Sequence, residues 1–274
     1  MFKIALGQML VEGGRKEANL ARAQAMIARA AQRGARLVVL PETLNAGWTY
    51  PETKRLADPI PDGESCRALC EAARERGIYV CAGLAERAGK KTYNAAVLIR
   101  PDGGVALHSR KINVLEIGQG CYAIGDRLGV VETPLGVIGL MICADGFARG
   151  QCVSRTLGYM GAQIILSPSA WAVPPDHDNT KQPYGKLWLD NYRPVARDFL
   201  CWIAGVSNVG RVRGGAWNGW KCIGCSLVVG PTGQKVLQGP YGADAEALLE
   251  AEVEPLPRPA QGTGWDRYWR RNGL

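Results

Sequence analysis

The chain has 274 residues, of which 47% are hydrophobic and 21% are charged, so it suits one large domain over residues 1–274. Its net charge of +8 is compatible with nucleic-acid binding. The basic residues form only short local groups without interleaved aromatic side chains, however, so we expect no nucleic-acid partner. No apolar run approaches the roughly eighteen residues that cross a bilayer, and the first residues lack a signal-peptide pattern. We therefore expect no membrane association and a cytoplasmic location.

The nine cysteines do not form a disulfide framework. Their number is odd and they are scattered along the chain, which is typical of reduced thiols inside the cell. Two close pairs, Cys66 with Cys70 and Cys222 with Cys225, supply two ligands each, whereas a structural zinc site needs four. We therefore expect these cysteines to be buried as small apolar side chains, and no metal site.

Strands and helices alternate in the first part of the chain. The apolar periodicity predicts strands at 2–8, 36–40 and 78–83 and helices at 19–33 and 64–76. Gly34 and Gly77 follow the two helices, as glycine commonly does at a helix C-terminus. Short links between alternating strands and helices indicate a layered α/β fold.

The middle of the chain is predicted to contain antiparallel pairs of strands. Turn signatures predict two hairpins, with strands at 94–99, 105–111, 128–131 and 137–142. Beyond them, the pattern predicts helices at 153–160 and 186–199, strands at 163–166, 201–206, 222–229 and 248–253, a hairpin turn at 230–233, and a proline-rich tail. The irregular stretch 170–185 is long enough for a lid. This mixture predicts two sheets packed face to face with helices outside.

Cys143 is the first candidate for a catalytic nucleophile. It directly follows the apolar strand 137–142, where a sharp turn exposes a side chain beside free backbone N–H groups and a helix N-terminus lowers a thiol pKa. A buried core cysteine fits the same position. Many thiol hydrolases use histidine as the base, and this chain has only His108 and His177. A Cys–His pair stays open as an alternative.

Two charged residues also stand at strand ends. Glu42 follows the strand 36–40 and its Pro41, where a carboxylate is either a turn cap or an active-site base. Lys111 ends the strand 105–111, where a lysine usually lies in solvent but can also serve as an active-site cation. Taken separately, each residue is only suggestive.

Taken together and in this order, the segments around these residues resemble the nitrilase (carbon–nitrogen hydrolase) superfamily. The resembling segments are Leu-Val-Val-Leu-Pro-Glu at 37–42, Tyr-Asn-Ala-Ala at 93–96, His-Ser-Arg-Lys-Ile-Asn at 108–113, Thr-Pro-Leu-Gly at 133–136, Gly-Leu-Met-Ile-Cys-Ala-Asp at 139–145, Gly-Ala-Gln-Ile-Ile-Leu-Ser-Pro-Ser-Ala-Trp at 161–171 and Ser-Asn-Val-Gly at 207–210. The resemblance implies an α/β fold, a four-layer αββα sandwich of two mixed sheets with helices outside. It also implies a triad of Glu42, Lys111 and Cys143.

The resemblance further implies hydrolysis of an amide, a nitrile or an N-carbamoyl group without a cofactor. We favour a small linear amide or N-carbamoyl compound, cleaved by water through a thioester on Cys143. Glu42 would then be the base, and Lys111 and the backbone N–H of Ala144 would stabilise the oxyanion. Family members commonly form homodimers or larger homo-oligomers. Two alternatives stay open: a nitrilase, and a non-catalytic member that binds a metabolite or a partner protein.

The chain departs from the family pattern at two places that concern the site. Gly118 stands where many relatives have a second glutamate, so Glu116 is the candidate substitute. The usual Cys-Tyr-Asp is Cys-Ala-Asp at 143–145, without the Phe-Pro-Glu that commonly follows, so the substrate cannot be inferred from relatives. We expect Trp48, Trp171 and Tyr192 to line a pocket that suits either a polar or an apolar substrate.

Overall fold

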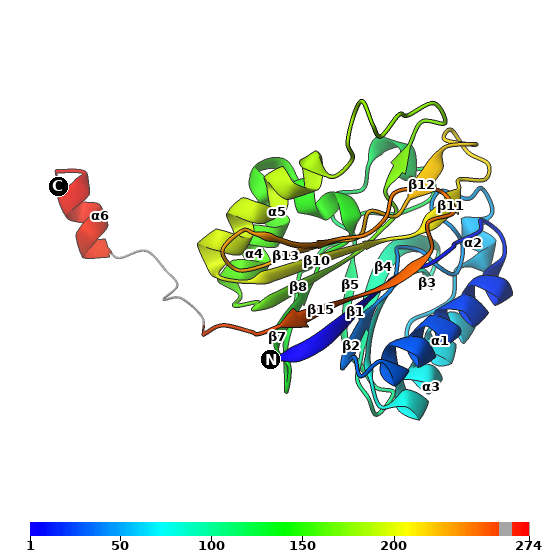
Figure 1. The fold of residues 1–274 in the computed structure, drawn as a ribbon, viewed down its shortest axis with the longest axis horizontal. Coiled ribbons are helices and arrows are strands. Elements are labelled where there is room, and N and C mark those ends of the chain that lie inside the picture. Colours follow the sequence, from blue (N-terminus) through cyan, green and yellow to red (C-terminus); the bar gives the residue numbers. More distant parts are fainter. Residues whose placement is uncertain (258–264, 274) are drawn as a thin grey trace.

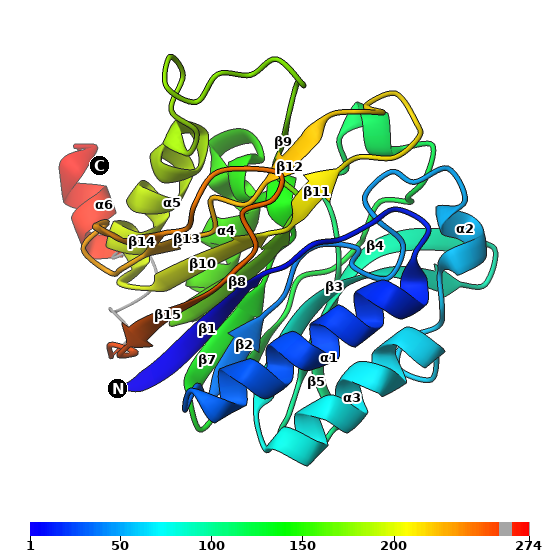
Figure 2. The ribbon, with the colours of Figure 1, turned by 45° about the vertical axis from the view of Figure 1, so that its right-hand side comes forward.

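The computed structural model of the chain describes residues 1–257 and 265–273. Two six-stranded sheets lie face to face, with helices on their outer sides (Figure 1 and Figure 2). The predicted four-layer sandwich is therefore confirmed. The predicted proline-rich tail falls partly on 258–264, and the predicted single domain also includes 258–264 and 274, all of which lie outside the described residues.

The first sheet has the strand order β15-β1-β2-β3-β4-β5. Its strands are β1 (Phe2–Gln8), β2 (Leu37–Val39), β3 (Tyr79–Ala88), β4 (Lys91–Ile99), β5 (Val105–Arg110) and β15 (Ala247–Val253). β1, β2 and β3 run parallel, and the remaining neighbours pair antiparallel. Helices α1 (Lys16–Gln32) and α3 (Glu64–Arg76) cover its outer face, and a short α2 (Thr53–Leu56) contacts β3.

The second sheet repeats this plan, with the order β14-β13-β10-β8-β7-β6. Its strands are β6 (Val130–Thr133), β7 (Gly136–Leu140), β8 (Ile164–Ser169), β10 (Trp202–Ser207), β13 (Leu227–Val229) and β14 (Lys235–Gln238). β7, β8 and β10 are parallel, with antiparallel strands on both sides. Helices α4 (Cys152–Tyr159) and α5 (Lys186–Phe199) lie on its outer face (Figure 1).

The central strands are apolar on both faces, and this explains the layers. In β1, Ile4 and Leu6 join the core between the two sheets, while the intervening Ala5 joins the core under the helices. β2 does the same, with Leu37 and Val39 toward the second sheet and Val38 toward the helices. Because side chains alternate along a strand, a strand with this pattern is stable only between two apolar layers.

A small third sheet completes the fold at the ends of β8 and β10. It joins β9 (Ala172–Val173), β11 (Val209–Arg211) and β12 (Lys221–Ile223) in the order β11-β12-β9. β9 follows β8 and β11 follows β10, so this sheet lies at the carboxyl edge of the second sheet. Among the described residues, no helix is both long and apolar enough for a membrane crossing.

The predicted strand at 222–229 is wrong. Gly224 and Cys225 have φ angles of 64° and 57°, in the left-handed region, which interrupts an extended strand. The segment therefore divides into β12 in the third sheet and β13 in the second sheet. The pattern of apolar residues is continuous across the break, and for this reason it did not reveal the change of sheet.

Other elements differ from the prediction mainly at their ends. α1 begins at Lys16 rather than Asn19. The Asn19 side chain accepts a hydrogen bond from the N–H of Glu12 and donates one to its carbonyl. The 170–185 stretch contains β9 and is otherwise irregular, apart from turns. A short helix, α6 (Trp265–Arg271), lies beyond the proline-rich segment and was not predicted.

Candidate active site

Each predicted triad residue lies within three residues of the end of a strand. β2 leads to Glu42, β5 to Lys111 and β7 to Cys143. All three residues are buried, with 1%, 2% and 7% of their surface exposed. The Lys111 Nζ lies 2.7 Å from the Glu42 Oε1. Cys143 lies near enough to Lys111 for the two side chains to interact electrostatically. The structure therefore brings the three residues together at one edge of the sandwich.

Asn94 on β4 holds both members of the charged pair. Its side-chain Nδ2 donates to Glu42 Oε1 at 2.5 Å, and its backbone carbonyl accepts the N–H of Lys111 at 2.8 Å. The neighbouring strand β3 carries Gly83, where a Cβ would come within 2.5 Å of the Glu42 Cα. Glu42 is thus fixed from two sides, and its second oxygen, Oε2, has no hydrogen-bond partner among the described residues.

Cys143 begins a 3-10 turn, η2 (Cys143–Phe147), in a strained conformation. Its backbone φ is +46°, in the left-handed region that residues other than glycine rarely adopt. Its N–H donates to the Oγ of Ser167 on β8 at 3.2 Å, and the N–H of Glu42 donates to the carbonyl of Ser169 on the same strand at 3.2 Å. β8 therefore fixes the backbone of both the nucleophile candidate and the base candidate, and so their relative position.

Asp145 connects the nucleophile turn to the end of β5. One carboxylate oxygen accepts the N–H groups of Ile112 and Asn113 at 3.1 and 2.7 Å, and the other accepts the N–H of Ile142 at 2.9 Å. Asn113 donates in return to the carbonyl of Ala144 at 2.7 Å. These bonds fix the segment after Lys111 against the segment after Cys143.

Burial governs the charge states of the site. It raises the pKa of the Cys143 thiol to about 12, together with the negative charge of Glu42 and against the opposing charge of Lys111. Burial alone would lower the pKa of Lys111, but the negative charge of Glu42, 2.7 Å away, outweighs burial, so the pKa of Lys111 is raised. At neutral pH the thiol is therefore neutral and the ammonium is charged. The expected lowering of the thiol pKa by a helix N-terminus does not occur, because α4 begins only at Cys152.

A pocket of about 130 Å³ opens at Cys143. Its walls are mainly aromatic, formed by Trp48, Phe147, Trp171, Tyr184, Trp188 and Trp217. The prediction for Trp48 and Trp171 agrees with this lining. Tyr192 does not line the pocket, because it is completely buried and lies behind Trp188, with ring centroids 5.9 Å apart.

The structure does not bring Glu116 into the site. Glu116 lies in the 3-10 turn η1 (Glu116–Gly118) with an exposed side chain. Among the described residues it has no hydrogen bond or ion pair with Glu42 or Lys111. The turn points the side chain to solvent, so the interpretation of Glu116 as a replacement for the second glutamate lacks structural support.

Neither histidine contacts Cys143. The His108 Nε2 lies 3.1 Å from a carboxylate oxygen of Glu86, and the His177 Nδ1 lies 2.8 Å from the hydroxyl of Tyr241. A carboxylate is therefore the basic group that the structure offers to the thiol, and the alternative of a Cys–His pair loses its support.

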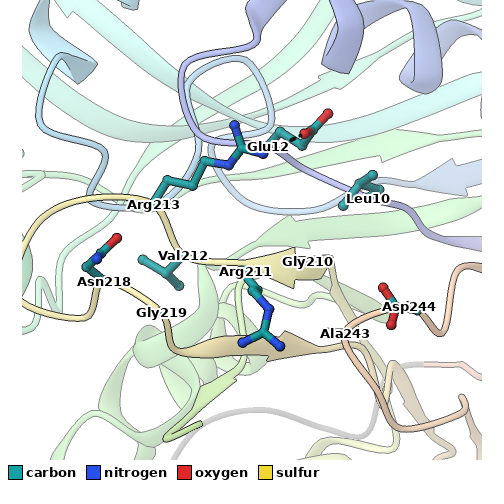
Figure 3. A pocket seen from close by; sticks show the side chains of 10 residues that line it. All are labelled: Leu10, Glu12, Gly210, Arg211, Val212, Arg213, Asn218, Gly219, Ala243 and Asp244. Carbon is teal, nitrogen blue, oxygen red and sulfur yellow. Dashed lines mark hydrogen bonds and ion pairs between the residues drawn. The ribbon is translucent and has the colours of Figure 1, made fainter.

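A wider pocket of about 370 Å³ lies beside β11, away from the triad (Figure 3). Its Arg213 forms an ion pair of 3.0 Å with Glu12, which also pairs with Arg22. Figure 3 shows Asp244 on the opposite side of the pocket from Arg213. None of Glu42, Lys111 and Cys143 lines this pocket, so it does not serve the triad.

Comparisons with known proteins agree with this arrangement. The family description "Carbon-nitrogen hydrolase" matches residues 3–256. The chain belongs to the carbon–nitrogen hydrolase family. The resemblance seen in the sequence is thus confirmed, and the chain is a hydrolase of carbon–nitrogen bonds.

The relatives of this carbon–nitrogen hydrolase carry more specific names. A nitrilase from Pyrococcus abyssi is 33% identical over 236 residues, which is 84% of this chain and 82% of the relative. An omega-amidase from Homo sapiens is 31% identical over 263 residues, which is 92% of this chain and 88% of the relative. Both names agree with the reactions that the sequence analysis left open, hydrolysis of an amide or of a nitrile.

Solved structures share the fold. A carbon–nitrogen hydrolase from Helicobacter pylori has a TM-score of 0.81 at 24% identity and covers 92% of this chain and 89% of its own. An amidase from Nesterenkonia sp. AN1, with acrylamide added at its active-site cysteine, has a TM-score of 0.78 at 21% identity, with complete coverage of both chains. The likeness supports the same sandwich for this hydrolase.

Several residues of the site were not assigned from the sequence. Asn94 and Asp145 lie inside segments that carried the resemblance. The available signal was a polar residue in an apolar strand for Asn94, and an acidic residue two positions after Cys143 for Asp145. Trp188 and Trp217 gave no such signal, because they come from a helix and a glycine-rich loop far apart in the chain. Their role depends on tertiary structure.

Proposed function

We propose that this hydrolase cleaves a small, linear, non-peptide amide or N-carbamoyl compound through a thioester on Cys143. The observation that carries the proposal is the buried Glu42–Lys111 pair beside the strained turn of Cys143. A buried base, a fixed cation and a thiol in contact range are the groups that acyl transfer requires. The omega-amidase and nitrilase relatives support the same class of substrate.

In the first half of the reaction, Cys143 attacks the carbonyl carbon of the substrate. Because its pKa is about 12, the thiol must lose its proton to a base as the sulfur–carbon bond forms. Glu42 takes that proton through Oε2, the oxygen without a partner. The substrate oxygen becomes negative and is stabilised by the Lys111 ammonium and the backbone N–H of Ala144. Glu42 then protonates the leaving nitrogen, which departs as ammonia or an amine and leaves a thioester.

In the second half, water replaces the amine. Glu42 removes a proton from the water as its oxygen attacks the thioester carbon, and the same two donors stabilise the new oxyanion. Collapse of this intermediate breaks the carbon–sulfur bond. The proton held by Glu42 returns to the Cys143 sulfur, so the acid is released and the enzyme is regenerated. A nitrile substrate uses the same groups and differs in how the first intermediate collapses.

Ammonia release by Cys143 variants tests the proposal. We expect propionamide, or another short amide, to release ammonia with the unchanged protein and none above background with Cys143→Ala. Cys152→Ala is the matched control, because Cys152 is exposed and lies outside the site. Mass spectrometry of protein stopped during turnover should show the acyl mass on Cys143. Turnover that survives in Cys143→Ala contradicts the mechanism.

We further propose that the enzyme works in the cytoplasm as a homodimer or larger homo-oligomer. All nine cysteines are free, which fits a reducing compartment. Light scattering of the purified protein gives the oligomeric state directly, and a monomer at all concentrations contradicts that part of the proposal.

A further inference from the structure

The pocket at Cys143 contains no charged side chain among the described residues that line it. Two tryptophan pairs form much of its wall. Trp171 and Trp188 are stacked, with ring centroids 4.5 Å apart and planes tilted by 20°. Trp48 and Trp217 meet at 4.9 Å with a tilt of 54°. An aromatic wall of this kind offers area and ring faces but no counter-charge for an ionic group.

Both tryptophan pairs are held in place by their surroundings. Trp171 rests on Gly205 of β10, where a Cβ would come within 2.8 Å of its ring. The Nε1 of Trp188 donates to the hydroxyl of Tyr184 at 2.9 Å. Trp217 stacks on Trp220 at 4.1 Å with a tilt of 8°. Because these contacts are with other parts of the protein, they fix the wall of the pocket, and a fixed wall can discriminate between substrates by shape.

The pocket has the size of one ring. Its volume is about 130 Å³. An engineered apolar protein cavity of about 150 Å³ binds one benzene molecule, so the two volumes are comparable. Aromatic rings also prefer offset or edge-to-face contacts with other rings, which several differently tilted side chains provide.

We propose that the enzyme selects an uncharged amide whose acyl part carries one apolar or aromatic ring, and that it rejects monoamides of dicarboxylic acids. This inference rests on the proposed function and names its substrate class; the amide stays linear because its carbon–nitrogen bond is not part of the ring. A carboxylate in the pocket would be desolvated without a partner, which is strongly unfavourable. No Lys or Arg is among the described residues that line the pocket, and Lys111, behind Cys143, already pairs with Glu42.

Three amides test the substrate class in one assay of ammonia release. Phenylacetamide carries the ring, succinamic acid carries a carboxylate, and propionamide is the short neutral reference. We expect kcat/KM for phenylacetamide to exceed that for succinamic acid by about a hundredfold or more, and to exceed that for propionamide. A preference for succinamic acid, or equal rates for all three, overturns the inference while leaving the proposed function intact. Failure of all three amides and of a small N-carbamoyl compound to react contradicts the proposed function itself.

Variants of the wall separate a specificity role from a structural one. Trp217→Ala should lower kcat/KM for phenylacetamide by about tenfold, a clearly larger loss than for propionamide. Trp202→Ala is the matched control, because Trp202 stands at the amino end of β10, opposite the pocket, and donates to the carbonyl of Glu254. An equal loss for both substrates in Trp217→Ala overturns a ring-binding role for Trp217.

A charge placed in the pocket gives an independent test. Leu187 lines the pocket near the start of α5 and is 51% exposed, so a longer polar side chain is tolerated there. Leu187→Arg should raise kcat/KM for succinamic acid by about tenfold and lower that for phenylacetamide. No gain for succinamic acid in a folded Leu187→Arg protein contradicts the view that a missing cation causes the rejection.

Discussion

Glu42 and Lys111 depend on each other because both charges are buried. Their side chains are 0% and 2% exposed and 2.7 Å apart. Removing one charge from such a pair leaves the other without compensation, at a cost of about 3–5 kcal/mol. The charge that we propose for the oxyanion is therefore also a charge that the fold needs, so the two effects must be measured separately.

Lys111→Met should therefore affect activity and stability together. We expect a loss of turnover on the order of a hundredfold to a thousandfold, since one oxyanion donor contributes roughly 3–4 kcal/mol. The double variant Glu42→Gln with Lys111→Met removes both charges and should recover much of the free energy of unfolding without recovering activity. Urea unfolding and ammonia release measure the two effects. Unchanged turnover per folded molecule in Lys111→Met would make Lys111 purely structural.

At the scale of residues, the proximity of Glu42, Lys111 and Cys143 could be predicted because each is a reactive residue near a strand end within a recognisable segment. Glu116 could not be placed in the same way. It was chosen because it lies two residues before Gly118 in the chain, and the structure has a 3-10 turn there with the Glu116 side chain exposed. Sequence spacing predicts a contact only where the backbone between two positions is regular.

At the scale of elements, the strands that lie in the sandwich were predicted better than those around the site. Long apolar strands such as β1 and β4 leave a pattern of several residues. β9 has 2 residues and β11 and β12 have 3 each, which is too short for any periodicity. The third sheet, and with it the position of the loop that carries Trp217, therefore depends on contacts that no local pattern contains.

One ion-paired cluster links β3 to β5 across β4. Glu86 on β3 accepts two hydrogen bonds from Arg110, at 2.7 and 2.6 Å, and lies 3.1 Å from His108. Arg110 also lies over the ring of Tyr93 on β4, 4.0 Å from its centroid. Burial alone would raise the pKa of Glu86, but these partners lower it from 4.5 to about 2. The carboxylate is therefore more acidic in the folded protein than in the unfolded chain.

This cluster predicts a loss of stability in acid. A carboxylate with a lowered pKa stabilises the fold fully above its unfolded pKa of 4.5, and that contribution disappears as the pH falls toward 2. The difference corresponds to about 3 kcal/mol. Glu86→Gln should lower the free energy of unfolding at pH 7 and flatten its dependence between pH 4.5 and 2. Glu132→Gln, at an exposed position of β6, is the control. An equal slope in Glu86→Gln and the unchanged protein contradicts the assignment.

At the scale of the whole molecule, two cores hold the layers together. One lies between the sheets, continues under α4 and α5, and includes Ile165 and Cys143; the other lies between the first sheet and helices α1 and α3 and includes Leu69. The sandwich could be predicted because strands that are apolar on both faces must be covered twice. The sandwich architecture does not by itself show that the molecule unfolds as one unit, because two cores can also unfold separately.

We predict that both cores unfold in a single transition. The strands of the first sheet contribute to both cores, with Val39 on one side and Val38 on the other, so neither core survives the loss of that sheet. Ile165→Ala and Leu69→Ala each leave a cavity at a completely buried position and should cost about 2–5 kcal/mol. Each should lower the melting temperature of the same transition, by roughly 2–4 °C per kcal/mol.

Two probes report on different parts of that transition. Circular dichroism follows all helices and strands, whereas tryptophan fluorescence responds strongly at the site, where Trp48, Trp171, Trp188 and Trp217 line the pocket. For one cooperative domain the two melting curves coincide in the unchanged protein and shift together in both variants. Two separate transitions, with Ile165→Ala moving one and Leu69→Ala moving the other, would mean that the core under α1 and α3 folds independently of the core that includes Cys143.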